Sequence, residues 1–166
     1  MKTLLLTAAA AFFMFHVTYS QTTQEQMTTI DKTKKEIDNS MDSYQKTIEQ
    51  KNGTSTKTVY MDGCELKLVT IAIIENGIAK SVNLYFTNGA LMYATQVGTS
   101  VKTGNIVGND VTYVNNNQAL SWTTNGNVAV NSSSKKFKSM NTELMAYASN
   151  LGKGTCVNSS IPLVTK

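Results

Sequence analysis

The sequence predicts an α+β protein with a long N-terminal amphipathic helix, an antiparallel meander of about seven strands, and a C-terminal helix. Apolar residues recur at helical spacing near both ends of the chain, whereas the period falls to two between them. Asn-Gly and Asp-Gly pairs interrupt this middle stretch, as hairpin turns do. Because the strands follow one another without intervening helices, an antiparallel sheet is favoured over a parallel one.

The first twenty residues have the composition of a secretory signal peptide. Lys2 supplies a positive charge, residues 4–15 form an apolar region, and Thr18 and Ser20 are small residues at the positions that a signal peptidase reads. The apolar stretch is shorter than the roughly 20 residues that span a bilayer. We therefore expect residues 1–20 to be cleaved before Gln21. Residues 21–166 should then form a single α+β domain, secreted or periplasmic, without a transmembrane segment.

The N-terminal helix is expected over residues 24–50. Its apolar residues form one stripe on the helix surface, which we expect to pack on the protein's own sheet rather than in a coiled coil, because Lys34 interrupts the stripe. Asn52 and Gly53 tolerate the left-handed conformation that ends a helix. The stripe consists of Met27, Ile30, Ile37, Met41, Tyr44 and Ile48.

Turn positions predict the strand registers, because a two-residue turn determines which residues face each other. For turns at residues 76–77 and 88–89, the expected pairs are Ile71 with Val82, Val69 with Leu84, Phe86 with Leu91, and Leu84 with Tyr93. The expected core face of these strands consists of Val69, Ile71, Ile73, Val82, Leu84, Phe86, Leu91 and Tyr93.

The later turns, at residues 116–117 and 124–126, bury the only tryptophan. The expected pairs are Tyr113 with Leu120, Val111 with Trp122, Trp122 with Val128, and Leu120 with Val130. Two stretches fit the alternating pattern of a regular strand less well. Adjacent Leu68 and Val69 indicate a β-bulge near the first hairpin, and residues 98–108 form either a mobile loop or a second bulged corner.

A second helix is expected to begin after residues 132–134 and to end at Gly152. Its stripe consists of Phe137, Met140, Leu144, Ala148 and Leu151. We expect this helix to cover the sheet face opposite the core, which carries Ala72, Asn83, Tyr85, Met92 and Ala94. If both helices pack on one face instead, Tyr85 and Met92 stay exposed and become candidate binding residues.

Three lysines at the start of the second helix, Lys135, Lys136 and Lys138, complete the candidate binding surface. Their charge opposes the helix dipole, so an anionic partner would relieve it, although a solvated cluster that keeps the protein soluble accounts for them as well. Cys64 and Cys156 are the only cysteines. Outside the cytosol we expect them to form a disulfide that closes a loop of 92 residues.

Few residues of this chain are of the types that carry out catalysis. The only histidine, His16, lies in the predicted signal peptide, so the mature protein has none for a nucleophile–histidine pair or a zinc site. The chain also has no arginine and no phosphate-binding glycine loop, which argues against nucleic-acid and nucleotide binding. The remaining candidate acids, each typical of a solvated turn, are Asp62, Glu65, Glu75 and Asp110. A calcium site at residues 108–110 would lack the ligand set of an EF-hand loop.

These observations predict a secreted or periplasmic, non-enzymatic binding module without cofactor or metal, such as an inhibitor or immunity-type partner of another protein. Three other classes remain open: a small carboxylate-dependent hydrolase, an envelope-associated structural or adhesive protein, and a small-molecule or lipid carrier. A hydrolase should show two convergent acids in one cleft, a carrier should show a sizeable apolar cavity, and a structural protein should self-associate. Oligomeric state and the use of glycosylation sequons at Asn52, Asn131 and Asn158 stay open.

Overall fold

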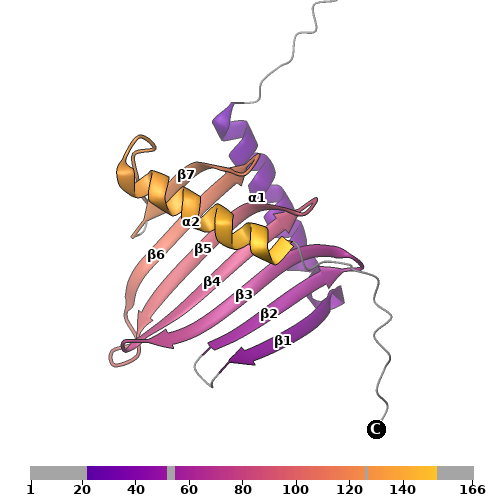
Figure 1. Ribbon diagram of the computed structural model, residues 1–166, viewed down its shortest axis with the longest axis horizontal. Coiled ribbons are helices and arrows are strands. Elements are labelled where there is room, and N and C mark those ends of the chain that lie inside the picture. Colours follow the sequence, from indigo (N-terminus) through magenta and orange to yellow (C-terminus); the bar gives the residue numbers. More distant parts are fainter. Residues whose placement is uncertain (1–21, 52–54, 126, 153–166) are drawn as a thin grey trace, which may run out of the picture.

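An antiparallel sheet of eight strands carries one helix on each of its faces (Figure 1). The structure, a computed structural model, describes residues 22–51, 55–125 and 127–152, so the predicted signal peptide lies outside the described residues. The elements are α1 (Thr23–Ser40), the 3-10 helix η1 (Met41–Ser43), β1 (Gln45–Lys51), β2 (Ser55–Asp62), β3 (Glu65–Glu75), β4 (Ile78–Thr87), β5 (Ala90–Ser100), β6 (Ile106–Asn115), β7 (Gln118–Thr124), β8 (Val128–Ala129) and α2 (Lys135–Gly152). Strand order in the sheet equals strand order in the chain, which confirms the predicted antiparallel meander.

Helix α1 is shorter than the sequence predicted, and the end of the predicted helix is strand β1. A capping box between Thr22 and Glu25 starts the helix. It stops near Ser40 because Asn and Ser side chains compete for backbone hydrogen bonds, and the Ser43 hydroxyl donates to the Ser40 carbonyl at 2.7 Å. The following residues then pair with β2 from Gln45 to Lys51. The predicted stop at residues 52–53 lies outside the described residues.

The β3–β4 register is the predicted one, but a bulge changes the next pairing. Residues 69 and 71 face 84 and 82 as expected, and Phe86 faces Leu91. Between Tyr85 and Phe86 the register shifts, so Leu84 pairs with Ala94 and not with Tyr93. Since a one-residue insertion reverses the side-chain alternation beyond it, Tyr93 lies on the opposite face from the predicted one.

A second bulge, between Tyr113 and Val114, changes the β6–β7 register, and the turn after Thr124 lies one residue later than expected, which changes the β7–β8 register. The Trp122 partner on β6 is Thr112, and the Val130 amide donates to the Trp122 carbonyl at 2.9 Å. The predicted pairs Tyr113–Leu120, Val111–Trp122, Trp122–Val128 and Leu120–Val130 are therefore wrong. Trp122 is nevertheless buried, with 6% of its surface exposed.

Both irregular stretches expected from the sequence contain bulges. In the first hairpin Met61 pairs with Leu66 and Tyr60 with Leu68, which leaves Lys67 as the extra residue and turns Leu66 to the same face as Val69. Residues 98–108 are not a long loop: β5 and β6 continue through a register shift next to Gly98, and the turn covers only residues 101–105.

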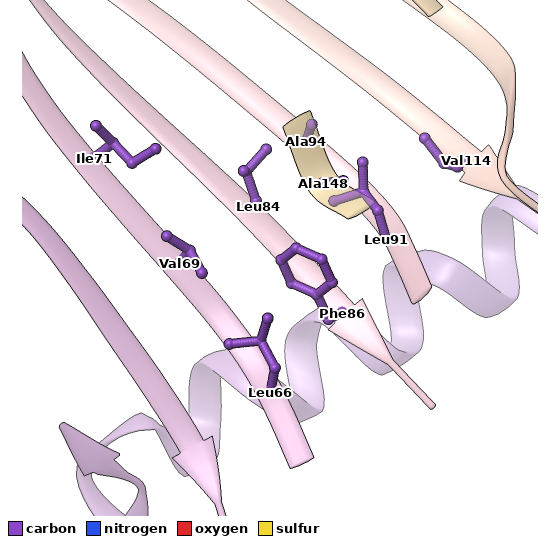
Figure 2. Packing of buried hydrophobic residues seen from close by; sticks show 9 residues of the cluster. All are labelled: Leu66, Val69, Ile71, Leu84, Phe86, Leu91, Ala94, Val114 and Ala148. Carbon is purple, nitrogen blue, oxygen red and sulfur yellow. The ribbon is translucent and has the colours of Figure 1, made fainter. Parts of the chain in front are cut away.

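The main core lies between the sheet and α2. Figure 2 shows eight side chains from β3 to β6 on one sheet face, with Ala148 of α2 above them and α1 behind the sheet. These nine residues are Leu66, Val69, Ile71, Leu84, Phe86, Leu91, Ala94, Val114 and Ala148. The Ser134 hydroxyl caps α2 by accepting from the Phe137 amide at 3.1 Å, as the sequence predicted.

Helix α1 covers the other face, so the expected arrangement of the two helices is reversed. Its interface is partly polar: the Tyr85 hydroxyl donates to Asp38 at 2.9 Å and the Tyr113 hydroxyl donates to Asp31 at 2.8 Å. Lys34 lies over the Tyr85 and Tyr93 rings and pairs with Asp38. The reversal follows from the bulge in β5, because it gathers three tyrosines on one face, and their hydroxyls need polar partners that α1 has and the apolar stripe of α2 lacks.

Candidate functional site

A cavity of about 650 Å³ opens between the N-terminal half of α2 and the central strands. Its size falls within the range of small-molecule sites, which is roughly 300–1,000 Å³. α2 crosses the sheet at an angle and leaves part of the same face uncovered (Figure 1). The cavity is therefore bounded by the helix on one side and by the sheet below.

Regular pairing of β4, β5 and β6 builds the floor. An inner row beneath α2 consists of Leu84, Ala94 and Thr112. The next row outward consists of Val82, Gln96 and Asp110. All six residues line the cavity, and no register shift interrupts the strands between these rows. The floor thus changes from mainly apolar to mixed along the strands.

Helix α2 forms the wall with residues at helical spacing, which therefore share one face. These are Lys135, Lys136, Ser139, Met140, Glu143 and Leu144. Met140 and Leu144 supply apolar surface, whereas the others are exposed. The Ser139 hydroxyl donates to the Glu143 carboxylate at 2.8 Å, which holds that acid on the wall.

Trp122 lines the cavity from β7. Its ring lies 6.4 Å from the Phe137 ring, centroid to centroid, and the Lys136 ammonium lies 5.0 Å from its centroid. A cation at this distance is attracted by the electron-rich ring face. Lys136 is therefore held near the inner row, because Trp122 pairs with Thr112.

Asp110 is the half-buried acid of the floor. Within the described ranges its carboxylate makes no hydrogen bond and no ion pair. A carboxylate in this setting can accept hydrogen bonds from a ligand that carries hydroxyl or ammonium groups. Gln96, the neighbour of Asp110 on β5, adds an amide that both donates and accepts.

A second hollow of about 150 Å³ continues the floor outward from the cavity. It shares Gln96 and Asp110 with the cavity and adds a third row, in which Lys80, Gly98 and Gly108 face one another. The Lys80 ammonium is paired with Glu75 at 3.1 Å.

The predicted site residues separate into three groups. Lys135, Lys136 and Asp110 meet at the cavity, whereas Lys138 is exposed on α2 and does not line it. Tyr85 and Met92 are only 6% and 4% exposed beneath α1, so the arrangement that would have left them as surface residues does not occur.

The other predicted acids have structural contacts or lie elsewhere. Glu65 accepts from Lys67 at 2.7 Å and from the Asn88 amide at 2.9 Å, and these hydrogen bonds lower the pKa of its carboxyl. Asp62 and Glu75 do not line the cavity. Cys64 is the second residue of the first hairpin turn, but Cys156 lies outside the described residues, so the disulfide stays a prediction. Among the described residues there is no cluster of three or more potential metal ligands.

Sequence reasoning missed Glu143, Gln96 and Ser139. Glu143 precedes Leu144 of the apolar stripe and lies one turn beyond Ser139, so its place beside the sheet-facing stripe was a usable signal. No such signal exists for Gln96, because the sheet face on which its side chain lies depends on the bulge in β5.

Comparison with known proteins identifies no relative: no family model matches the chain, and neither the curated proteins nor the solved structures give a match. Neither helix among the described residues is long and apolar enough to cross a membrane.

Proposed function

We propose that this protein is a non-enzymatic binding module that works outside the cytosol and holds a small amphipathic molecule between α2 and the sheet. The observation that carries the proposal is the 650 Å³ cavity with its apolar floor and polar margin. Such a combination is typical of sites where apolar surface supplies affinity and a few polar groups orient the ligand. The location rests on the signal-peptide pattern of residues 1–20.

A small-molecule ligand is favoured over a protein partner for a specific reason. The apolar residues expected to form an exposed patch, Tyr85 and Met92, are covered by α1. The apolar surface of the cavity, in contrast, lies in a concave site beneath a helix. An inhibitor or immunity-type role would need an interface of about 800 Å² per partner, and the buried Tyr85 and Met92 do not contribute to one.

The test uses three probes with the same eight-carbon tail: octylamine, octyl glucoside and octanoate. Trp122 is the only tryptophan and lines the cavity, so its fluorescence should change on binding of a probe. Isothermal titration below the micellar concentration gives the affinities. We expect at least one probe to bind.

Gln96→Phe should weaken that binding at least tenfold, because the exposed Gln96 side chain stands on the cavity floor. The matched control is Ser81→Phe, at an exposed position on the neighbouring strand and on the opposite face. Binding that Gln96→Phe leaves unchanged, or no binding of any probe, would overturn the proposal.

A carboxylate-dependent hydrolase is the second candidate, because Asp110 and Glu143 line the same cavity. Paired acids on two sides of one cleft can act as general acid and as base or nucleophile. A panel of 4-nitrophenyl glycosides tests this: turnover that both Asp110→Asn and Glu143→Gln abolish would establish an enzyme. Binding without turnover would leave the protein a binding module.

A further inference from the structure

We propose that the ligand is an elongated amphiphile whose tail lies beneath α2 and whose head carries hydrogen-bond donors and extends over Gly98 and Gly108. This inference deepens the proposed function and rests on it. It assigns a direction to the site, from the inner row of the floor to the outer row, and a chemical class to the head group.

Gly108 is the first observation. It lies within β6, where glycine costs stability relative to residues with side chains. Its φ is outside the left-handed region, and a Cβ atom built there would meet nothing within 4 Å. Neither backbone conformation nor packing therefore requires glycine at this position. Glycine in a strand interior is often found where a ligand approaches the backbone closely.

Gly98 lies on β5 and faces Gly108 of β6, so the two residues together form a patch of the sheet surface without side chains. A Cβ atom there would meet Ile78 and Val107 at 3.5 Å, an ordinary contact distance. Two facing glycines thus leave the outer row flat where side chains could stand. The patch adjoins Gln96 and Asp110 directly, since all four residues line the second hollow.

Polarity along the floor gives the direction. Leu84 and Ala94 make the inner row apolar, and Met140 and Leu144 of α2 add half-buried apolar surface beside it that suits a hydrocarbon tail. In the middle row the unpaired Asp110 carboxylate and the Gln96 amide lie side by side on neighbouring strands. A head group on this row meets a carboxylate that lacks a donor, so ammonium or hydroxyl groups suit it and a carboxylate does not.

Neither Lys136 of the wall nor Lys80 of the outer row reverses this preference. Lys136 stands over the Trp122 ring, and Trp122 belongs with Thr112 to the inner row. Lys80 of the outer row is paired with Glu75. The Asp110 carboxylate of the middle row is therefore the first polar group that a ligand head group over Gly98 and Gly108 meets.

The test compares the three eight-carbon probes. Octylamine, octyl glucoside or both should bind at least tenfold more tightly than octanoate at 150 mM salt, and Asp110→Asn should remove most of that difference. Binding of only the amine would identify an ammonium head, and binding of only the glucoside would identify a hydroxyl head; either result supports the inference.

Gly108→Val tests the extension separately. The variant should unfold at the same or a higher temperature, because its Cβ has open space. It should weaken octyl glucoside, with its broad head, at least tenfold and change octanoate less than twofold. Asn109→Val, the next residue on the opposite face, is the matched control and should change neither probe.

Two results would overturn the inference while leaving the proposed function in place. One is tighter binding of octanoate than of both other probes. The other is unchanged binding of octyl glucoside by Gly108→Val. If no probe binds at all, the proposed function itself fails.

Discussion

Trp122 serves the core and the candidate site at the same time. Its ring is buried against Phe137, and with Ala119 these residues form a separate small core at the β7 end of the sheet, onto which Val130 and Met140 pack. The same residue lines the cavity. A substitution there is therefore expected to change stability first, and any effect on binding has to be measured on protein that is shown to be folded.

Replacing Trp122 by Ala should cost roughly 3–5 kcal/mol of the free energy of unfolding, the range for a large aromatic side chain removed from a packed site. Chemical denaturation followed by circular dichroism measures this. Trp122→Phe, which keeps an aromatic ring, should lose less. An unchanged midpoint for Trp122→Ala would mean that the indole contributes nothing to the core.

The burial of Trp122 could be predicted from its apolar neighbours in the sequence, but its contacts could not. Expected neighbours were Val111, Leu120 and Val128, whereas Val128 is in fact 63% exposed. The bulge between Tyr113 and Val114 changes the β6–β7 register, and no turn residue in the sequence predicts it. Asp110 could be named as a candidate acid, but its place beside Gln96 could not be foreseen, because the β5–β6 register shifts next to Gly98.

At the scale of elements, α1 is held by a polar layer. Tyr85, Tyr93 and Tyr113 lie on three neighbouring strands, with the ring centroids of successive pairs 5.6 and 5.0 Å apart. Asp31 and Asp38, which accept hydrogen bonds from two of them, are not part of the apolar stripe of the predicted helix. Their hydrogen bonds from Tyr113 and Tyr85 show that they are interface residues.

This layer predicts a loss of stability at alkaline pH. Burial, and then the hydrogen bond to Asp38, raises the pKa of Tyr85; burial and Asp31 raise that of Tyr113 in the same way. The unfolded chain releases these protons near pH 10, while the folded protein keeps them. The unfolded state then binds fewer protons, so the free energy of unfolding falls as pH rises above about 10.

Denaturant titrations at pH 9, 10 and 11 measure how steeply the free energy of unfolding falls with pH. The double variant Tyr85→Phe, Tyr113→Phe should be less stable at pH 9, since two hydrogen bonds are lost, and should show a shallower decline above pH 10. Lysine titration is common to both proteins and cancels in the comparison. An identical slope would show that these tyrosines do not titrate with folding.

The end of α1 shows why an amphipathic pattern can mislead. Met41, Tyr44 and Ile48 continue the helical stripe, yet Gln45–Lys51 form β1. Apolar spacing over one more turn distinguishes a helix from a strand only weakly, and here all seven residues of the strand pair with β2. The C-terminal helix had clearer ends, a serine cap and a glycine, and its predicted span is confirmed.

For the whole molecule, the predicted Cys64–Cys156 disulfide has a measurable consequence. On the chain-entropy estimate, closing a loop this long contributes about 4–5 kcal/mol. Protein purified without reductant should resist alkylation at both cysteines, and peptide mapping should recover them linked. Reduction should lower the denaturation midpoint, whereas Cys64→Ser should reproduce that lower midpoint and respond no further to reductant. Alkylation of both thiols in the native protein would refute the bond.

The neighbour-to-neighbour strand order also determines when each part can form. Every hairpin closes over a short stretch of chain, so the sheet can grow one strand at a time with little loop entropy. Helix α1 is different: its hydrogen bonds to Tyr85 and Tyr113 join residues 47 and 82 positions apart. The element nearest the N-terminus must therefore wait until β4 to β6 are assembled. Substitutions at Asp31 or Asp38 should then accelerate unfolding and leave the folding rate almost unchanged.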